Sequence, residues 1–349
     1  MGVFKQLPQV LIPWYHVNKR ELPWRNDREP YHIWVSEIML QQTRVEAVRN
    51  YYLRFIDALP SVEALASVDD DRLNKLWEGL GYYSRARNLK KAAQKIISDH
   101  GGVFPRKYEE VIMLPGIGEY TAGAICSIAY NQKTPAVDGN VLRVASRLLN
   151  DKTSIDLPAF KSCVRKQLEN AYPEQAGDFT QALMELGATI CGPNRKAACE
   201  ECPCNKICAS YKAGTTDLLP VKSPKKEKKS EALTVFILEC DDKYAIEKRE
   251  PSGLLAGLWQ FPNVKGKLGD QEALDYLQVC DLAPREIIKT VDREHIFTHI
   301  RWQMHGVYIT VKEISGKFTW LTGEQIDAEA ALPTAFRQFW HSRKDDKHE

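Results

Sequence analysis

Residues 114–118 have the sequence Leu114-Pro115-Gly116-Ile117-Gly118 and separate two stretches of helical character, 108–113 and 119–129. Two glycines allow the backbone to turn tightly and to approach another molecule closely. The start of the following helix offers N–H groups and the positive end of the helix dipole, which suit a phosphate. A Pro-Gly-x-Gly turn is also common as a plain connection between helices. The stretch alone therefore predicts a helical hairpin and leaves phosphate binding open.

The sequence around this hairpin predicts a helical region over residues 30 to 210. Apolar residues recur at intervals of three and four, as at Val45, Val48 and Tyr52, which is the period of one helix face. Thr43 and Glu46 have the spacing of a capping box and predict a helix start. A further helix is expected over residues 84–99. Its basic side chains fit a solvated face as well as they fit a DNA contact.

The chain changes character after residue 218. Residues 219–230 contain two prolines and five lysines with a single acid, a composition that predicts a linker. Beyond it, residues 232–238 and 307–311 are rich in β-branched and aromatic residues and predict strands, with a helix expected between them at 271–279. We therefore expect a helical domain over residues 1–216, a linker over 217–230 and a mixed α/β domain over 231–345.

Length and composition limit the classes of protein that fit. A chain of 349 residues is long for one hydrophobic core and predicts about two domains. Its formal net charge of +2 is close to neutral, so any nucleic-acid interface has to be a local basic surface. No segment has the length and apolarity of a membrane helix, and Pro8 and Pro13 interrupt an N-terminus that is unlike a signal peptide. The composition, with 44% apolar and 27% charged residues, is typical of a soluble globular protein.

Five of the nine cysteines lie between residues 191 and 208. An odd, clustered set of thiols indicates a metal site in a reducing compartment rather than a disulfide framework. The pattern Cys191-x7-Cys199-x2-Cys202-x5-Cys208 places four thiols within 18 residues, which is enough to surround an iron–sulfur cluster. Zinc is the alternative, although structural zinc sites usually have two closely spaced pairs. The additional thiol of Cys204 leaves the ligand set open.

Glu37 lies in an apolar stretch that runs from Ile33 to Leu40. A carboxylate in such surroundings is costly unless it is paired or protonated. An apolar pocket raises its pKa into the range of a general acid. Periodicity alone favours the simpler interpretation, in which Glu37 lies at the polar edge of an amphipathic helix.

Several segments together resemble one family. Residues 114–121 resemble the helix-hairpin-helix of the endonuclease III superfamily of DNA glycosylases, and residues 137–141 resemble its catalytic aspartate segment. Residues 22–25 and 34–43 resemble signatures of the MutY-type adenine DNA glycosylases. The resemblance covers residues 5 to 340. It implies an α+β multidomain fold, with an all-α helix-hairpin-helix glycosylase and its iron–sulfur cluster loop followed by a C-terminal α/β Nudix-like domain.

The resemblance also implies a reaction, the excision of adenine from DNA. Glu37 is expected to protonate adenine at N7, and Asp138 to stabilise the oxocarbenium-like sugar, with Asn140 positioning Asp138 or the water. Glycosidases use two carboxylates for the same kind of bond cleavage. Relatives that also cleave the strand have a lysine where this chain has Tyr120, because a Schiff base needs an amine. We therefore expect a monofunctional glycosylase.

An enzyme that acts on a base within a duplex has to flip that base out of the stack. The resemblance implies that Gln42 and Tyr82 wedge beside the opposite base. It further implies residues that bind DNA or line the adenine pocket: Arg20, Trp24, Arg25, Thr43, Leu114, Gly116, Gly118 and Gln181.

The cysteine loop of the family binds a 4Fe-4S cluster that is not the chemical catalyst. The family normally has six, two and five residues between the ligands. Apart from one extra residue in the first gap, this implies as ligands Cys191, Cys199, Cys202 and Cys208. The basic residues Arg195, Lys196 and Lys206 on the same loop are expected to face phosphates.

The C-terminal domain resembles a Nudix domain without its catalytic metal ligands. Residues 257–262 resemble the strand that enters the Nudix box, but residues 266–274 lack the carboxylates that bind magnesium there. The family uses this domain to recognise 8-oxoguanine through a loop that normally reads Phe-Ser-His, and the corresponding residues here are Phe297, Thr298 and His299. Thr298 keeps the hydroxyl, and Phe297 is expected to stack or wedge. On their own, these three residues would fit an ordinary turn at a strand end.

The resemblance therefore implies double-stranded DNA with adenine opposite 8-oxoguanine or guanine as the substrate. It also leads us to expect a monomeric cytoplasmic protein that associates with the nucleoid through DNA. Three alternatives remain from the sequence. Tyr120 argues against a bifunctional glycosylase and lyase for oxidised pyrimidines. Glu37 and Asp138 argue against a non-enzymatic iron–sulfur DNA-binding protein. The missing carboxylates argue against a nucleotide pyrophosphohydrolase fused to a DNA-binding domain.

Overall fold

The computed structural model describes residues 2–193, 197–224 and 227–343, and the chain divides into two compact units. The first unit contains Met1–Val68 and Arg87–Pro224, and the second contains Asp69–Ala86 and Lys225–Glu349. Residues 69–86, which belong to the helical region of the sequence, thus group with the C-terminal residues. No helix in the described part of the chain is long and apolar enough to cross a membrane.

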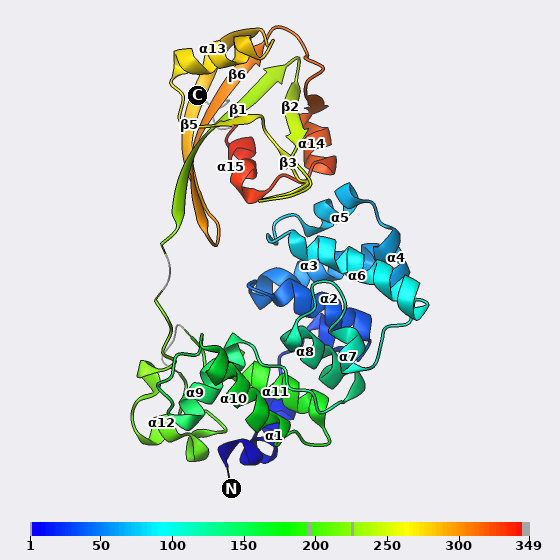
Figure 1. The fold of residues 1–349 in the computed structure, drawn as a ribbon, viewed down its shortest axis with the longest axis vertical. Helices are drawn as coiled ribbons and strands as arrows, with labels where there is room; N and C mark the ends of the chain where they lie inside the picture. The colour runs from blue at the N-terminus through cyan, green and yellow to red at the C-terminus, as the bar shows by residue number, and fades with distance from the viewer. Residues whose placement is uncertain (1, 194–196, 225–226, 344–349) are drawn as a thin grey trace. The chain divides into compact units, whose positions relative to one another are not determined.

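The region from residue 30 to residue 210 is helical, as the sequence predicts (Figure 1). The helix expected over residues 84–99 extends one residue further, and the one expected over 108–113 ends at Val111. The α-helices up to residue 212 are α1 (Leu7–Asn18), α2 (Pro30–Leu40), α3 (Val45–Ala58), α4 (Val62–Ser67), α5 (Asp70–Trp77), α6 (Ser84–His100), α7 (Tyr108–Val111), α8 (Glu119–Tyr130), α9 (Gly139–Leu149), α10 (Pro158–Glu169), α11 (Ala176–Thr189) and α12 (Ala209–Lys212). Short 3-10 helices lie at Val3–Gln6, Pro23–Arg25, Asn205–Ile207 and Thr216–Leu218.

The predicted capping box at Thr43 and Glu46 is wrong. Helix α3 begins at Val45 after Arg44, and no side chain caps it. The Thr43 hydroxyl instead donates to the carbonyl oxygen of Gln41 at 3.3 Å. This local hydrogen bond belongs to the turn that ends α2, so the hydroxyl serves the preceding helix end rather than the following helix start.

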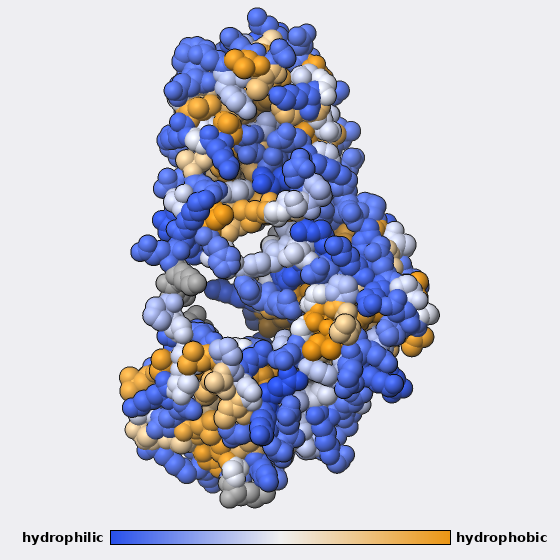
Figure 2. Space-filling view, in the orientation of Figure 1, coloured by the Kyte–Doolittle hydropathy of each residue, from blue (hydrophilic) through white to orange (hydrophobic). Residues whose placement is uncertain are grey.

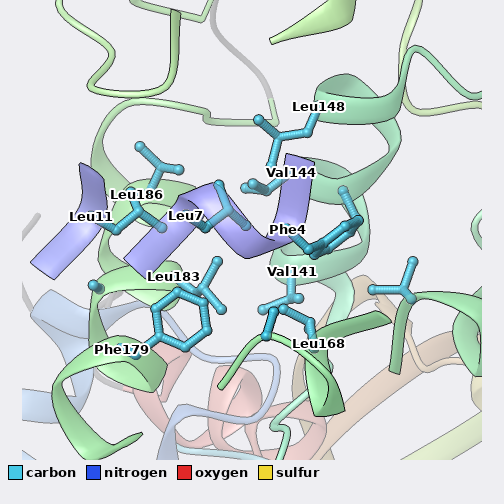
Figure 3. Close-up of a cluster of buried hydrophobic side chains, with 14 of the residues drawn as sticks. Phe4, Leu7, Leu11, Val141, Val144, Leu148, Leu168, Phe179, Leu183 and Leu186 are labelled. Carbon is cyan, nitrogen blue, oxygen red and sulfur yellow. The ribbon is translucent and has the colours of Figure 1, made fainter. Parts of the chain in front are cut away.

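One hydrophobic core cluster of the first unit lies where α1, α9, α10 and α11 meet (Figure 3). Each helix contributes apolar residues at intervals of three and four, so that one stripe along each helix is buried. The labelled members of this core are Phe4, Leu7, Leu11, Val141, Val144, Leu148, Leu168, Phe179, Leu183 and Leu186.

Gly123 allows α8 to lie unusually close to the segment that leads to Asp138. A Cβ atom at this position would lie 2.3 Å from the carbonyl oxygen of Pro135. That oxygen belongs to the backbone, so it cannot rotate away as a side chain would. The close approach therefore sets the distance between α8 and the residues that precede Asp138.

The second unit is built on a sheet with the strand order β3-β2-β1-β6-β5, in which β4 pairs with β1 and β7 pairs with β2. Strands β1 and β6 are parallel, and the other pairs are antiparallel. Residues 229 and 230, expected in the linker, already pair with β6. The strands are β1 (Lys229–Cys240), β2 (Lys243–Lys248), β3 (Trp259–Gln260), β4 (Asn263–Lys265), β5 (Pro284–Ile296), β6 (Ile300–Val311) and β7 (Thr319–Thr322).

Helices cover both faces of this sheet (Figure 1). Successive residues of a strand point to opposite faces. Val235 and Ile237 of β1 accordingly pack with α14 (Gly323–Glu329) and α15 (Thr334–Ser342), whereas Phe236 packs with α13 (Asp270–Val279). The apolar residues of β1 are thus buried on both faces of the sheet, which explains its nearly continuous apolar sequence.

Hydrophilic side chains cover most of the face drawn in Figure 2, and hydrophobic side chains form smaller patches there.

We expect the substitution Gly123→Ala to lower the stability of the first unit. The added methyl group has to displace backbone, and overpacking of this kind costs about 1–3 kcal/mol, which corresponds to a fall in melting temperature of roughly 2–10 °C. Thermal unfolding followed by circular dichroism measures the change. Gly316→Ala is the control, because a Cβ atom there meets nothing within 4 Å. Equal melting temperatures for the two variants would contradict this interpretation.

Candidate active site

A cavity of about 630 Å³ opens in the first unit and collects most of the residues that the sequence implicates in catalysis and base binding. It is lined by residues from the N-terminal segment, α2, the loop after it, the start of α8, the start of α9 and α11. Both carboxylates, Glu37 and Asp138, line this cavity. The other predicted residues that line it are Arg20, Trp24, Arg25, Gln42, Thr43, Gly118, Tyr120, Asn140 and Gln181.

Glu37 lies on α2 with 6% of its surface exposed. The Tyr120 hydroxyl donates a hydrogen bond to Oε2 of Glu37 at 2.7 Å. Burial raises the pKa of Glu37 to about 7, and the nearby charge of Asp138 adds to this, while the Tyr120 hydrogen bond and Arg25 oppose it. A carboxyl with this pKa can hold a proton near neutral pH and release it during a reaction.

Asp138 caps the N-terminus of α9 and thereby holds a fixed orientation. Its Oδ1 accepts from the backbone N–H of Val141 at 2.8 Å, and its Oδ2 accepts from the Asn140 side-chain amide at 2.7 Å. Burial raises the pKa of Asp138 above its ordinary value, and these two donors oppose the rise. Asn140 therefore contacts the carboxyl group of Asp138 directly.

Hydrogen bonds lead from Asp138 to the cysteine loop. Asn140 Oδ1 accepts from Arg143 Nη2 at 2.9 Å, and Arg143 Nε donates to the carbonyl oxygen of Cys191 at 2.8 Å. Arg147 Nη1 lies 3.1 Å from the Cys191 sulfur. The first cysteine of the loop is thus connected to the carboxylate of the site by ordered polar groups.

Glu185 on α11 is part of the site and was missed in the sequence. Its side chain is fully buried, and it accepts from Arg20 Nε and from Arg25 Nη2, each at 2.7 Å. Burial alone would raise the pKa of Glu185, but the hydrogen bonds from Arg20 and Arg25 outweigh it, so the pKa lies below its ordinary value. Glu185 fixes both guanidinium groups at the cavity wall. Its apolar neighbours in α11 were the same signal that drew attention to Glu37.

The hairpin has the expected form, although only part of it lines the cavity. Gly116 has a φ of 77°, a left-handed conformation that favours glycine. Leu114 is buried, and Gly118 is the residue before α8 and lines the cavity beside Tyr120. The N–H groups at the start of α8 have no partner within the helix, so they remain suited to a phosphate.

A separate apolar pocket is lined by all five clustered cysteines, Cys191, Cys199, Cys202, Cys204 and Cys208. In the described residues, no three His, Cys, Asp or Glu side chains are placed to hold one metal ion. An iron–sulfur cluster does not require that arrangement, because each thiolate binds a different iron atom. The donor chemistry and the apolar wall fit such a cluster. Arg195 and Lys196, expected to face phosphates, lie outside the described residues, whereas Lys206 lies in the 3-10 helix of this loop.

The remaining predicted residues lie outside the cavity. Thr298 and His299 form the exposed tip of the hairpin between β5 and β6, closed by a hydrogen bond from Phe297 N to the carbonyl oxygen of Ile300 at 2.8 Å. The Tyr82 hydroxyl lies 3.2 Å from Thr298 Oγ1 within the second unit. Tyr82 has a left-handed backbone with a φ of 45°, and Gln42, which lines the cavity, has one with a φ of 58°. Such strain in residues other than glycine is concentrated at functional sites.

Comparison with known proteins supports the assignment of this chain to the DNA glycosylases, the class of protein that its fold and cavity indicate. Residues 35–171 match the HhH-GPD superfamily of base excision DNA repair proteins, and residues 234–342 match the NUDIX domain. A thermostable thymine-DNA glycosylase is similar in structure, with a TM-score of 0.55 and 30% identity over 60% of this chain and 97% of that one. An endonuclease III bound to DNA, with a TM-score of 0.51 and 22% identity over 61% of this chain and 99% of that one, shares the fold.

Curated proteins with similar sequences narrow the class of protein to one family of DNA glycosylases. Adenine DNA glycosylase from Mus musculus is 34% identical over 97% of this chain and 78% of its own length, and that from Homo sapiens is 34% identical over 94% and 72%. The enzyme of the same name from Buchnera aphidicola subsp. Baizongia pistaciae is 33% identical over 88% and 87%. The chain belongs to the adenine DNA glycosylase family.

Replacement of Glu37 by glutamine is expected to stabilise the fold at alkaline pH. Because folding raises this pKa from 4.5 to about 7, the group favours the folded state fully below about pH 4.5 and progressively loses that contribution as the pH rises through 7. A neutral glutamine at this position escapes the cost of burying a charge, so Glu37→Gln should exceed the wild type by about 3 kcal/mol at pH 8 and should be close to it near pH 4.5.

Denaturant unfolding at pH 5 and pH 8 measures this difference. Glu46→Gln, on the exposed side of α3, is the control and should not gain stability at pH 8 as Glu37→Gln does. A Glu37→Gln advantage that is the same at both pH values would show that Glu37 is not a buried acid with a raised pKa.

Proposed function

We propose that this protein excises adenine from double-stranded DNA where adenine is opposite 8-oxoguanine or guanine. The observation that carries the proposal is the shared cavity, in which Glu37, Tyr120 and Asp138 face the same space. Its volume of about 630 Å³ is in the range of small-molecule sites, which are roughly 300–1,000 Å³. An extruded purine nucleoside can therefore be accommodated beside both carboxyl groups.

In the proposed reaction, Glu37 donates its proton to N7 of adenine as the bond between N9 and C1′ breaks. The base leaves as a neutral molecule, and the sugar becomes an oxocarbenium ion. Asp138, whose carboxyl group is oriented by its two N–H donors, stabilises that positive charge. Water then adds to C1′ and loses a proton, which leaves an abasic site. Glu185 contributes by holding Arg20 and Arg25 at the wall of the base pocket.

The protein is proposed to be monofunctional, with no strand cleavage of its own. Strand cleavage needs an amine that attacks C1′, and Tyr120 stands where the strand-cleaving relatives have lysine. The Tyr120 hydroxyl is already engaged with Glu37. Lys161 also lines the cavity, but its Nζ lies 3.3 Å from Glu119 Oε2 and is engaged in that ion pair.

Recognition of the opposite base is proposed for the second unit. Thr298 presents a hydroxyl at an exposed hairpin tip, beside the Tyr82 hydroxyl. Phe297 is partly buried and makes edge-on contacts with His295 and Trp302, with ring centroids 4.5 Å and 4.8 Å apart. The aromatic ring thus braces the loop, while Thr298 lies beyond the sheet and is able to hydrogen-bond a damaged guanine.

A 4Fe-4S cluster is the proposed cofactor, held by Cys191, Cys199, Cys202 and Cys208. When bound, the cluster crosslinks the loop through four iron–thiolate bonds and takes no part in the chemistry at adenine. The side chains of this loop would then be fixed against α9, where Arg143 and Arg147 already contact Cys191.

Single-turnover assays on duplexes with adenine opposite 8-oxoguanine, guanine or thymine test the proposed function. We expect excision in the first two and little in the third, with strand breaks that appear only after heat and alkali. Glu37→Gln and Asp138→Asn should each slow excision by at least roughly 100-fold, in line with the contribution of a general acid, while DNA binding is retained. Excision at wild-type rates in Glu37→Gln would rule out the mechanism.

Iron and acid-labile sulfide analysis tests the proposed cofactor. Cys199→Ser should reduce both iron and sulfide per chain, because serine is a poor ligand for the cluster. Cys204→Ser is the matched control in the same pocket and should retain both. The assignment of the four ligands is wrong if Cys204→Ser loses the cluster and Cys199→Ser keeps it.

A further inference from the structure

Glu78, directly after α5, is a buried carboxylate in a polar cluster with the C-terminal residues of the second unit. Its side chain is 8% exposed. Glu78 Oε1 accepts from the backbone N–H of Leu332 at 2.9 Å and pairs with the Arg337 guanidinium. Glu78 Oε2 lies 2.9 Å from Lys75 Nζ, which also donates to the carbonyl oxygen of Ala330 at 3.2 Å. We call these five residues the Glu78 cluster.

A second ion pair joins residues 69–86 to the C-terminal part of the second unit, but both of its side chains are exposed to solvent. Asp71 Oδ2 is 2.8 Å from Lys248 Nζ, and the two side chains are 42% and 48% exposed. Exposed pairs of this kind contribute little to stability, whereas removing one partner of a buried charged cluster leaves the others without compensation. The Glu78 cluster, not the exposed pair, therefore fixes residues 69–86 against the C-terminal part.

Residues 79–81 connect Glu78 to Tyr82 in a loop that is held by hydrogen bonds. Trp77 Nε1 donates to the carbonyl oxygen of Gly81 at 3.0 Å, and Arg85 Nη2 donates to that of Leu80 at 2.9 Å. Because these bonds hold the loop on both sides, a shift of Glu78 carries Tyr82 with it.

Arg337, on the other side of the cluster, belongs to a helix that contacts β5 and β6, the strands whose hairpin contains Thr298. Arg337 belongs to α15, and the Tyr308 hydroxyl of β6 donates to the carbonyl oxygen of Phe339 on α15 at 2.6 Å. Arg293 of β5 donates to the Ser342 hydroxyl at the end of α15 at 3.0 Å. The hairpin of β5 and β6 ends in Thr298, which lies 3.2 Å from the Tyr82 hydroxyl. The two residues of this contact, Tyr82 and Thr298, are therefore both connected to the Glu78 cluster through hydrogen-bonded elements.

We propose that Glu78 is a positioning residue that sets the selectivity for the base opposite adenine by holding Tyr82 against Thr298. The proposal rests on the proposed reading of 8-oxoguanine by Thr298. A hydrogen bond to the damaged base requires donor and acceptor to lie within a few tenths of an ångström of the right distance. Loosening the cluster weakens that contact, but it leaves Glu37, Asp138 and their cavity in the first unit intact. Selectivity should change while the excision step does not.

The experiment compares Glu78→Gln with Asp71→Asn in the full-length protein. Glutamine keeps an oxygen that accepts from Leu332 N–H, but it loses the charge that pairs with Lys75 and Arg337. The ratio of kcat/KM for adenine opposite 8-oxoguanine to that for adenine opposite guanine is expected to fall about tenfold in Glu78→Gln, a size typical of coupled buried groups. The change should lie mainly in KM, with single-turnover excision at saturation unchanged. Asp71→Asn should keep the ratio within about twofold of the wild type, as expected for an exposed pair.

Arg337→Gln tests whether the two groups act together. The double variant Glu78→Gln, Arg337→Gln should lose no more selectivity than either single variant, because each change breaks the same cluster. A wild-type ratio in a folded Glu78→Gln variant overturns the proposal. So does a loss in Glu78→Gln that is matched by Asp71→Asn.

Hydrogen exchange separates this proposal from the proposed function. Faster exchange at the Leu332 amide and at residues 297–299 in Glu78→Ala, with no change in Asp71→Asn, supports positioning even if the wild type shows no preference for 8-oxoguanine. That lack of preference would count against base reading by Thr298, and the selectivity part of the proposal would fall with it. Unchanged exchange in Glu78→Ala would overturn positioning itself, whatever the wild-type preference.

Discussion

The hydrogen bond from Tyr120 to Glu37 lies in a place where water would otherwise solvate the carboxylate. A carboxyl that is cut off from water favours its protonated form, and a single phenolic donor limits that tendency without cancelling it. The two residues come from α2 and α8, so the pKa of Glu37 depends on how closely those helices approach. Gly123 on the same helix sets a second distance, between α8 and the backbone at Pro135 in the segment that leads to Asp138. The acid of the site is therefore a product of helix packing and not of local sequence.

Glu37, Asp138 and Glu185 line the same cavity, and their surroundings give each carboxyl group a different character. Glu37 has one neutral donor and a raised pKa, whereas Glu185 has two guanidinium partners and a lowered one. Burial also raises the pKa of Asp138, and two N–H donors oppose that rise. Environments that drive the pKa values of neighbouring acids apart allow one to give a proton while another remains charged.

The sequence predicted the helical region, the strands and the residues of the cavity because those features follow from periodicity and from family motifs. It failed where the outcome depends on competition between local hydrogen bonds. Thr43 had the spacing of a cap, but its hydroxyl bonds within the preceding turn. Glu185 escaped notice because its role depends on Arg20 and Arg25, which are 165 and 160 residues away along the chain. Tyr82 and Thr298 are separated by 216 residues, so no spacing rule indicates that their hydroxyls meet.

The second unit is discontinuous, and this affects the order in which it can assemble during synthesis. Glu78 and Leu332 are joined by a hydrogen bond that spans 254 residues. The ribosome synthesises the N-terminal residues first. Glu78 can therefore meet Leu332 only after the chain has grown by a further 254 residues. The helical core of the first unit, with its own apolar residues, is complete well before that moment. Nascent chains therefore pass through a stage in which the helices around Glu37 and Asp138 can pack while the second unit is still incomplete.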